Sequence, residues 1–135
     1  MKKIKYFHFL IFLVLITSSC YDRDIIDAKE GVSLPPVTNL KSTLSNTDQI
    51  TLDWNIPSTI PAEFQRPMSV YIQVYRGTVR EYQITLPNEP VTWTYTLRQP
   101  DQKYRVIVKM YGRLKEKEYG KSDEIYSLGQ TVDVN

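Results

Sequence analysis

The most reactive side chains in this 135-residue chain are one cysteine and one histidine, and both stand near its start. Cys20 follows an apolar run, FLIFLVLI at residues 9–16, and the small residues TSS. Three lysines precede the run, and His8 lies beside it. This is the layout of a secretory signal peptide. The run is too short for a transmembrane helix, which needs about 20 apolar residues. We predict that residues 1–19 are a signal peptide that is removed.

The sequence before the cysteine resembles a bacterial lipobox, in which the cysteine becomes the acylated first residue of the mature chain. Thr17 stands where leucine is commonest in such boxes. Relaxed boxes that end in Ser-Cys are similar to those of Bacteroidota-type lipoproteins. The resemblance implies a lipid on Cys20 and a place in the bacterial envelope, on the outer membrane, facing the periplasm or the exterior. An ordinary signal peptide followed by a chance free cysteine is the alternative. An unpaired cysteine in an exported chain favours the lipid.

Processing removes most of the chemistry that the chain could perform. A mature chain with Cys20 acylated and His8 discarded has no histidine and no free thiol. This excludes Ser-His-Asp and Cys-His nucleophile systems and zinc sites of the usual nitrogen and sulfur type. The five glycines are scattered and form no phosphate-binding loop. We therefore predict no catalytic residues, no metal and no cofactor.

Charge excludes a further class of partner. Three of the 17 basic residues lie in the signal peptide, which leaves 14 basic against 15 acidic residues in the mature chain. Nothing in this balance indicates binding to nucleic acid. The acidic segment after Cys20 is not an EF-hand, because Ile26 and Asp27 occupy the fifth and sixth positions of the candidate loop. We predict a flexible tether over residues 20–34 and one domain over residues 35–135.

The domain has the alternation of β-strands. Ile50, Leu52 and Trp54 share one face of the segment QITLDW, and three later segments show the same period of two. We expect an all-β, antiparallel sandwich of two sheets. The segment 79–86 fits either sheet. The expected strands are 37–44, 48–55, 68–76, 79–86, 91–97, 103–111 and 123–132.

Three segments resemble a fibronectin type III domain over residues 35–134. PPVTNLKSTLSNTDQITLDWNIP is similar to the first two strands of that family, LRQPDQKYRVIV to its tyrosine corner, and YGKSDEIYSL to the lead into its last strand. The resemblance implies a seven-stranded, immunoglobulin-like sandwich. Trp54, Trp93 and Tyr104 are then core residues, with the hydroxyl of Tyr104 holding the preceding corner.

The outward residues of the third and sixth strands form the candidate binding face. Aromatic and cationic side chains are enriched at interaction surfaces, although tyrosine is also simply a good strand former. Tyr119, in the charged loop 112–121, is a second candidate, and Phe64 is expected to fold onto the core as a lid. The face comprises Tyr71, Gln73, Tyr75, Arg105, Ile107, Lys109 and Tyr111.

Three functions of different classes are compatible with such a chain. The leading hypothesis is a monomeric, lipid-anchored, non-catalytic module that binds a glycan or an envelope protein, or acts as a spacer. The alternative is an adhesive or fimbrial subunit that assembles by strand addition at a sheet edge. A carboxylate-based glycosidase is disfavoured, because it needs two acidic groups across a cleft, and the sequence assigns no cleft.

Overall fold

The computed structural model describes residues 31–134, and these residues form eight β-strands and no helix. The predicted all-β, antiparallel class is confirmed. The signal peptide, Cys20 and most of the predicted tether lie outside the described residues. The strands are β1 Thr38–Asn46, β2 Gln49–Asn55, β3 Ser69–Arg76, β4 Val79–Leu86, β5 Thr92–Thr96, β6 Tyr104–Arg113, β7 Glu124–Tyr126 and β8 Gln130–Val134.

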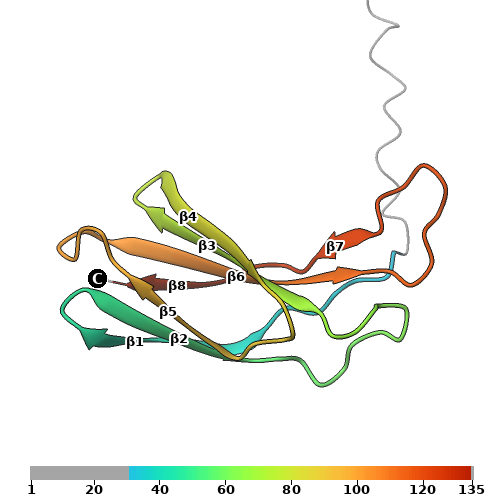
Figure 1. Ribbon diagram of the computed structural model, residues 1–135, viewed down its shortest axis with the longest axis horizontal. Coiled ribbons are helices and arrows are strands. Elements are labelled where there is room, and N and C mark those ends of the chain that lie inside the picture. Colours follow the sequence, from blue (N-terminus) through green and yellow to red (C-terminus); the bar gives the residue numbers. More distant parts are fainter. Residues whose placement is uncertain (1–30, 135) are drawn as a thin grey trace, which may run out of the picture. The chain divides into compact units, whose positions relative to one another are not determined.

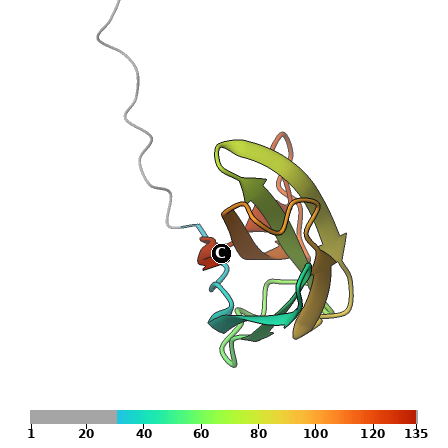
Figure 2. The ribbon, with the colours of Figure 1, turned by 90° about the vertical axis from the view of Figure 1, so that its left-hand side faces the viewer.

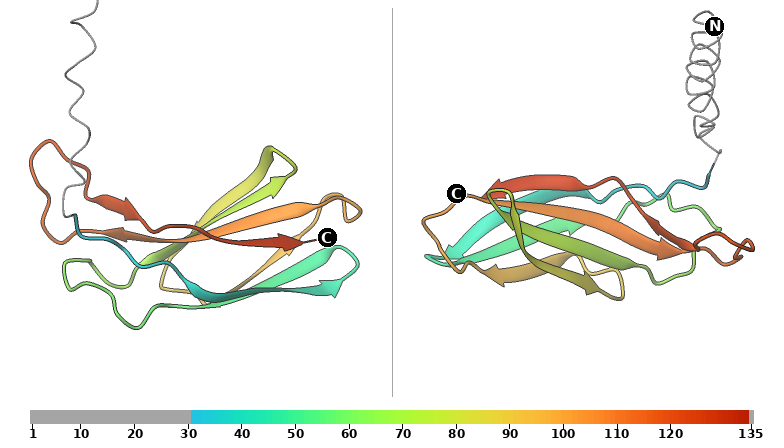
Figure 3. Two further views of the ribbon diagram at one scale, coloured as in Figure 1. Left: turned by 180° about the vertical axis from the view of Figure 1, so that it is seen from behind. Right: turned by 90° about the horizontal axis from the view of Figure 1, so that it is seen from above.

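The strands build two sheets that pack face to face (Figures 1 and 2). The first sheet has the order β1-β2-β5. The second has the order β4-β3-β6, with β7 and β8 both paired to β6. β4 thus joins the second sheet as a partner of β3, which settles the assignment that the sequence left open. β8 runs beside β1 on one side of the sandwich (Figure 3).

The core forms where the alternating residues of the two sheets meet. Ile50, Leu52 and Trp54 of β2 face the apolar residues of β3 and β6, as their period of two predicts. The indole N–H of Trp54 donates to the carbonyl of Pro90 at 2.7 Å, so its one polar atom has a partner. Burial of such alternating faces is the main driving force of the fold.

Two residues that were predicted to face inward from the strand 91–97 deviate from this pattern. Val91 precedes the strand and its side chain is 53% exposed, although its carbonyl accepts a hydrogen bond from the backbone N–H of Trp54 at 3.0 Å. Trp93 is partly buried and packs against the core from its edge, so it is not a central core residue. β5 is the edge strand of the first sheet, so no neighbouring strand covers its side chains on one side and they are open to solvent there.

Tyr104 forms the corner that was expected of it. Its ring is buried, and its hydroxyl accepts a hydrogen bond from the backbone N–H of Gln99 at 3.0 Å. The bond fixes the loop between β5 and β6 over the end of the core.

The last predicted strand, 123–132, is interrupted in the structure. β7 and β8 are separated at Ser127, whose backbone N–H donates to the carbonyl of Met110. The Ser127 hydroxyl in turn accepts from the Met110 N–H at 2.9 Å. The Ser127 hydroxyl thus accepts the hydrogen bond that a backbone carbonyl accepts in a regular β-sheet. Gly129 follows, and a Cβ there would lie 2.5 Å from Ile107 Cγ2, which is too close for any other residue without a shift.

The compact unit begins earlier than the boundary predicted at residue 35. Leu34 and Val37 are buried in the core, and the unit comprises Val32–Asn135. The apolar side chain of Leu34 explains the difference, because burial against the core assigns it to the domain although it precedes the two prolines. None of the described residues belongs to a helix that could cross a membrane.

The long loop between β2 and β3 is tied to the end of β6. Phe64 is 1% exposed and pairs with Leu114 in an isolated bridge, which confirms its expected role as a lid. The backbone N–H of Gln65 donates to the carbonyl of Arg113 at 2.8 Å. Gly112 makes room for this lid, since a Cβ there would lie 2.9 Å from Phe64 Cδ1.

Candidate functional site

The predicted binding face is the outer face of the five-stranded sheet. β3 and β6 are antiparallel neighbours, with Tyr71 opposite Lys109 and Tyr75 opposite Arg105. Partners that face each other in a sheet project to the same side, so these four side chains share one surface. Tyr71 and Tyr75 are half-buried, and Arg105 is exposed and forms an ion pair with Asp133 at 3.1 Å.

Gln73 does not present its side chain to a ligand. It is 9% exposed, and its amide donates to the hydroxyl of Tyr71 at 3.2 Å. The neighbouring rings and strands cover it because it lies at the centre of the sheet, between β4 and β6. Gln73 is therefore a residue that positions Tyr71, and the expectation that it contacts ligand is corrected.

Three tyrosines at one end of this face form a contiguous group, the tyrosine cluster: Tyr71, Tyr111 and Tyr126. The ring of Tyr126 lies 4.9 Å from that of Tyr111 and 5.4 Å from that of Tyr71, centroid to centroid, the second pair in an edge-to-face arrangement. Such distances are those of favourable aromatic pairs. Tyr126 is 49% exposed and is the most accessible of the three.

Hydrogen bonds hold two of the three hydroxyls. Tyr71 donates to Gln83 Oε1 at 2.9 Å, and Tyr111 donates to Glu124 Oε1 at 2.8 Å. Arg113 donates to the same carboxylate oxygen of Glu124 at 2.7 Å. The rings of the cluster are therefore oriented before any partner arrives.

Charge and burial act on the titratable groups of the cluster. The hydroxyl of Tyr111 and the carboxylate of Glu124 raise the pKa of Arg113 above its ordinary value, so its positive charge is retained. Burial raises the pKa of Tyr126, and the neighbouring Tyr111 and Glu124 add to the effect. At neutral pH Tyr126 is therefore a neutral phenol, and it lies beside the ion pair of Arg113 and Glu124.

Tyr126 was not among the predicted site residues. Its place in the cluster depends on the pairing of β7 with β6, which sets Tyr126 opposite Tyr111. A strand expected to run without interruption from 123 to 132 gives no reason to single it out. The only sequence signal is its position on the last strand, a sheet neighbour of β6 in this fold.

Tyr119, the other predicted ligand residue, lies in the loop between β6 and β7 and is fully exposed. Its ring makes no contact with another aromatic ring of the described residues. The structure therefore does not bring it into the tyrosine cluster. Its full exposure leaves it accessible to a partner.

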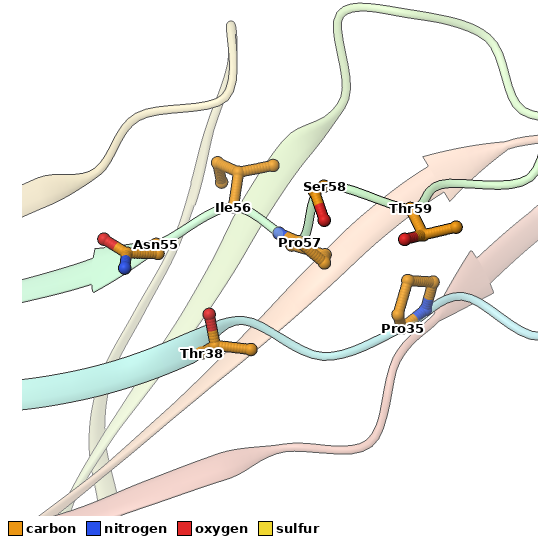
Figure 4. A pocket seen from close by; sticks show the side chains of 7 residues that line it. All are labelled: Pro35, Thr38, Asn55, Ile56, Pro57, Ser58 and Thr59. Atoms are coloured by element: carbon orange, nitrogen blue, oxygen red, sulfur yellow. The ribbon is translucent and has the colours of Figure 1, made fainter.

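A shallow pocket of about 410 Å³ lies at the start of β1 and the beginning of the β2–β3 loop (Figure 4). None of its lining residues titrates near neutral pH, so they offer no general acid or base. Within residues 31–134, no three acidic, histidine or cysteine side chains gather as a metal site. The pocket is lined by Pro35, Thr38, Asn55, Ile56, Pro57, Ser58 and Thr59.

The sheet order and the tyrosine corner define a fibronectin type III-like β-sandwich, and solved structures share this fold. The third fibronectin III domain of human KIAA0343 protein is similar over 76% of this chain and 85% of that chain, with 16% identity and a TM-score of 0.50. A structure described as a myokine is similar over 76% and 96%, with 15% identity and a TM-score of 0.51. A computationally redesigned β-sandwich protein is similar over 75% and 88%, with 17% identity and a TM-score of 0.50.

The chain belongs to the family described as "Domain of unknown function (DUF4945)", whose model matches residues 20–134. No curated protein matches the chain. The structural likeness therefore defines the fold, and the family assigns no activity.

Proposed function

We propose that the protein is a lipid-anchored, non-catalytic binding module of the bacterial envelope, which recognises an envelope protein or a glycan through the tyrosine cluster. The observation that carries this proposal is the cluster itself, in which the ring of Tyr126 packs against both Tyr71 and Tyr111 on the outer face of the sheet. Fibronectin type III-like domains are generally non-enzymatic modules that bind or connect, which agrees with the lack of catalytic groups predicted from the sequence.

The cluster suits recognition because its rings are already ordered. Tyrosine and arginine are enriched among the residues that contribute most to binding. An ordered aromatic side chain loses little conformational entropy when a partner binds. With Tyr71 and Tyr111 bonded through their hydroxyls, the exposed ring of Tyr126 is the part left for contact.

The proposed anchor limits where a partner can be. The family match begins at residue 20, which is the proposed acylated cysteine. From there to Val32, where the compact unit starts, the chain spans at most about 40 Å even when fully extended. A domain anchored in this way reaches only partners at or near the membrane surface.

The binding role is tested by replacing two rings of the cluster, the half-buried Tyr71 and the exposed Tyr126, in the double variant Tyr71→Ala with Tyr126→Ala. The protein and the variant are first compared by their retardation in gels that contain soluble polysaccharides. In a second assay, partners are cross-linked to each of them in intact envelopes and counted by mass spectrometry. We expect at least one interaction to be lost in the variant and kept in a Val79→Ala control, which removes an exposed apolar side chain from another strand. If every interaction survives in the double variant, the tyrosine cluster is not the binding site.

The anchor is tested separately by Cys20→Ala. In a host that processes such signals, the protein should partition with membranes and incorporate labelled fatty acid, and the variant should do neither. Membrane retention and labelling of the variant would refute the lipid anchor.

Two of the edge strands, β1 and β4, are irregular, which disfavours the adhesive alternative at those edges. The pairing of β1 shifts register twice, and β4 contains a bulge. Irregular edges hinder the addition of a further strand. We therefore propose a monomeric domain, and a concentration-dependent increase in size on gel filtration would contradict it.

A further inference from the structure

A second aromatic group lies between the edge strands of the two sheets, β4 and β5. We call Tyr82, Trp93 and Tyr95 the aromatic seam. Tyr82 comes from β4 of the second sheet, whereas Trp93 and Tyr95 come from β5 of the first. Figure 2 shows β4 and β5 on the same side of the sandwich, opposite β8. The seam therefore connects the two sheets through ring contacts along the edge that β4 and β5 form.

The seam is a platform of nearly parallel rings. Tyr82 and Trp93 have centroids 6.0 Å apart and planes within 8° of parallel, and Tyr95 lies 5.5 Å from each at 33° and 27°. Tyr82 is 37% exposed and Trp93 is partly buried, so part of the platform faces solvent. Rings so close to parallel cannot enclose a cation on three sides, as an aromatic cage does.

An acidic side chain is buried beside the platform by a β-bulge. Val74 pairs with Tyr82 and Tyr75 with Arg80, so Glu81 is the extra residue of β4. Regular alternation would place Glu81 outward with Gln83, but its side chain is only 6% exposed. Bulges re-aim side chains in this way and are frequent next to binding and active sites.

Two buried polar atoms at this place lack partners. Glu81 Oε2 and the hydroxyl of Tyr95 are both buried without a hydrogen bond among the described residues. The nearest cation to Glu81 is Arg76, at 3.7 Å from Oε1, which is longer than a hydrogen bond. Burial raises the pKa of Tyr95, and the negative charge of Glu81 raises it further, so the two groups lie within electrostatic reach.

Arg76 is the side chain that can open access to these atoms. Its side chain is 33% exposed, and it also bonds to the side chain of Gln99 on the loop between β5 and β6. Arginine has several rotatable bonds and remains charged. A rotation of Arg76 toward solvent would expose Glu81, while its guanidinium could still donate to a bound molecule.

From this arrangement we infer a second binding site, for a neutral sugar ring, formed by the aromatic seam with Glu81 and Arg76. The apolar face of the sugar packs on the solvent-facing part of the seam, which Tyr82 and Trp93 provide. One hydroxyl donates to Glu81 Oε2, and another accepts from Arg76. A neutral ligand fits because the acidic and the basic group already balance each other. A cationic ligand would have to compete with Arg76 for the same carboxylate.

The test uses Trp93 as its own reporter. The chain has two tryptophans, and the indole N–H of Trp54 is buried and bonded to Pro90, so nuclear magnetic resonance distinguishes the two indole signals. The protein is titrated with dextran, laminarin, mannan and xylan, and with polylysine as the cationic probe. We expect one neutral polysaccharide to shift the signal of Trp93 and leave that of Trp54 in place. No shift with any polysaccharide, or a shift with polylysine alone, overturns the proposal.

Two variants separate binding from folding. Tyr82→Ala removes an exposed ring of the platform and should weaken binding at least about ten-fold. Glu81→Gln keeps the shape but removes the buried charge, so it should weaken binding while raising the melting temperature, because functional residues are often held at the expense of stability. A lower melting temperature with unchanged binding would show that Glu81 is purely structural. Tyr126→Ala, in the tyrosine cluster, should leave the Trp93 response unchanged, so failure here is distinguishable from failure of the proposed function.

Discussion

The tyrosine corner offers a direct test of how one hydrogen bond supports the fold. The change Tyr104→Phe removes the hydroxyl that accepts from the Gln99 N–H at 3.0 Å and keeps the buried ring. A hydrogen bond of this kind contributes about 1 kcal/mol, and a donor left buried without a partner costs about 1–3 kcal/mol. The bond is partly buried, so we expect a loss of about 1–2 kcal/mol.

The loss is measured by urea unfolding at neutral pH, and again by calorimetry. For a domain of this size, it corresponds to a fall in melting temperature of about 5–15 °C. The dependence on urea concentration should stay unchanged, because the surface exposed on unfolding is nearly the same. Tyr75→Phe is the matched control, since the hydroxyl of Tyr75 has no partner among the described residues. If the two variants are equally stable, the corner bond does not contribute as reasoned.

Two further predictions concern the other end of the sandwich, at the end of β6 and in the loop between β4 and β5. Gly112→Ala should cost about 1–3 kcal/mol by overpacking against the buried ring of Phe64, and adding Phe64→Leu should recover part of the loss in a double-mutant cycle. The hydrogen bonds from Arg66 lower the pKa of Glu89 below its ordinary value of 4.5, so this carboxylate stabilises the fold above about that pH and loses its effect as the pH falls through the lowered value. Glu89→Gln should therefore lower the melting temperature by at most a few degrees at neutral pH and have no effect in strong acid; equal differences at both pH values would contradict this.

Much of the fold could be predicted because burial leaves a period of two in the sequence. The inward residues of β2, β3 and β6 follow that period without a break, and the structure buries them as expected. Trp54 and Tyr104 were identified from their motifs, and each has the hydrogen bond that its polar atom needs.

The features missed from the sequence depend on pairing between strands. The division of the last strand arises because Ser127 bonds to Met110, a residue 17 positions earlier. The burial of Glu81 arises because β4 inserts one residue opposite β3. Neither event changes the local pattern of apolar and polar residues, and so neither could be found without the partner strand.

The two aromatic groups differ in a way that bears on their roles. In the tyrosine cluster, Tyr71 and Tyr111 have satisfied hydroxyls, and the group is stable without a partner. In the aromatic seam, the hydroxyl of Tyr95 and one oxygen of Glu81 are unsatisfied within the domain. A satisfied surface gains affinity mainly from apolar contact, whereas an unsatisfied site gains it from supplying the missing hydrogen bonds. The first therefore suits a broad protein or glycan surface, and the second suits a small ring rich in hydroxyl groups. Binding at the seam should raise the melting temperature of the unmodified protein more than that of the Glu81→Gln variant. Only the unmodified protein keeps the Glu81 carboxylate, to which the ligand supplies the missing hydrogen bond.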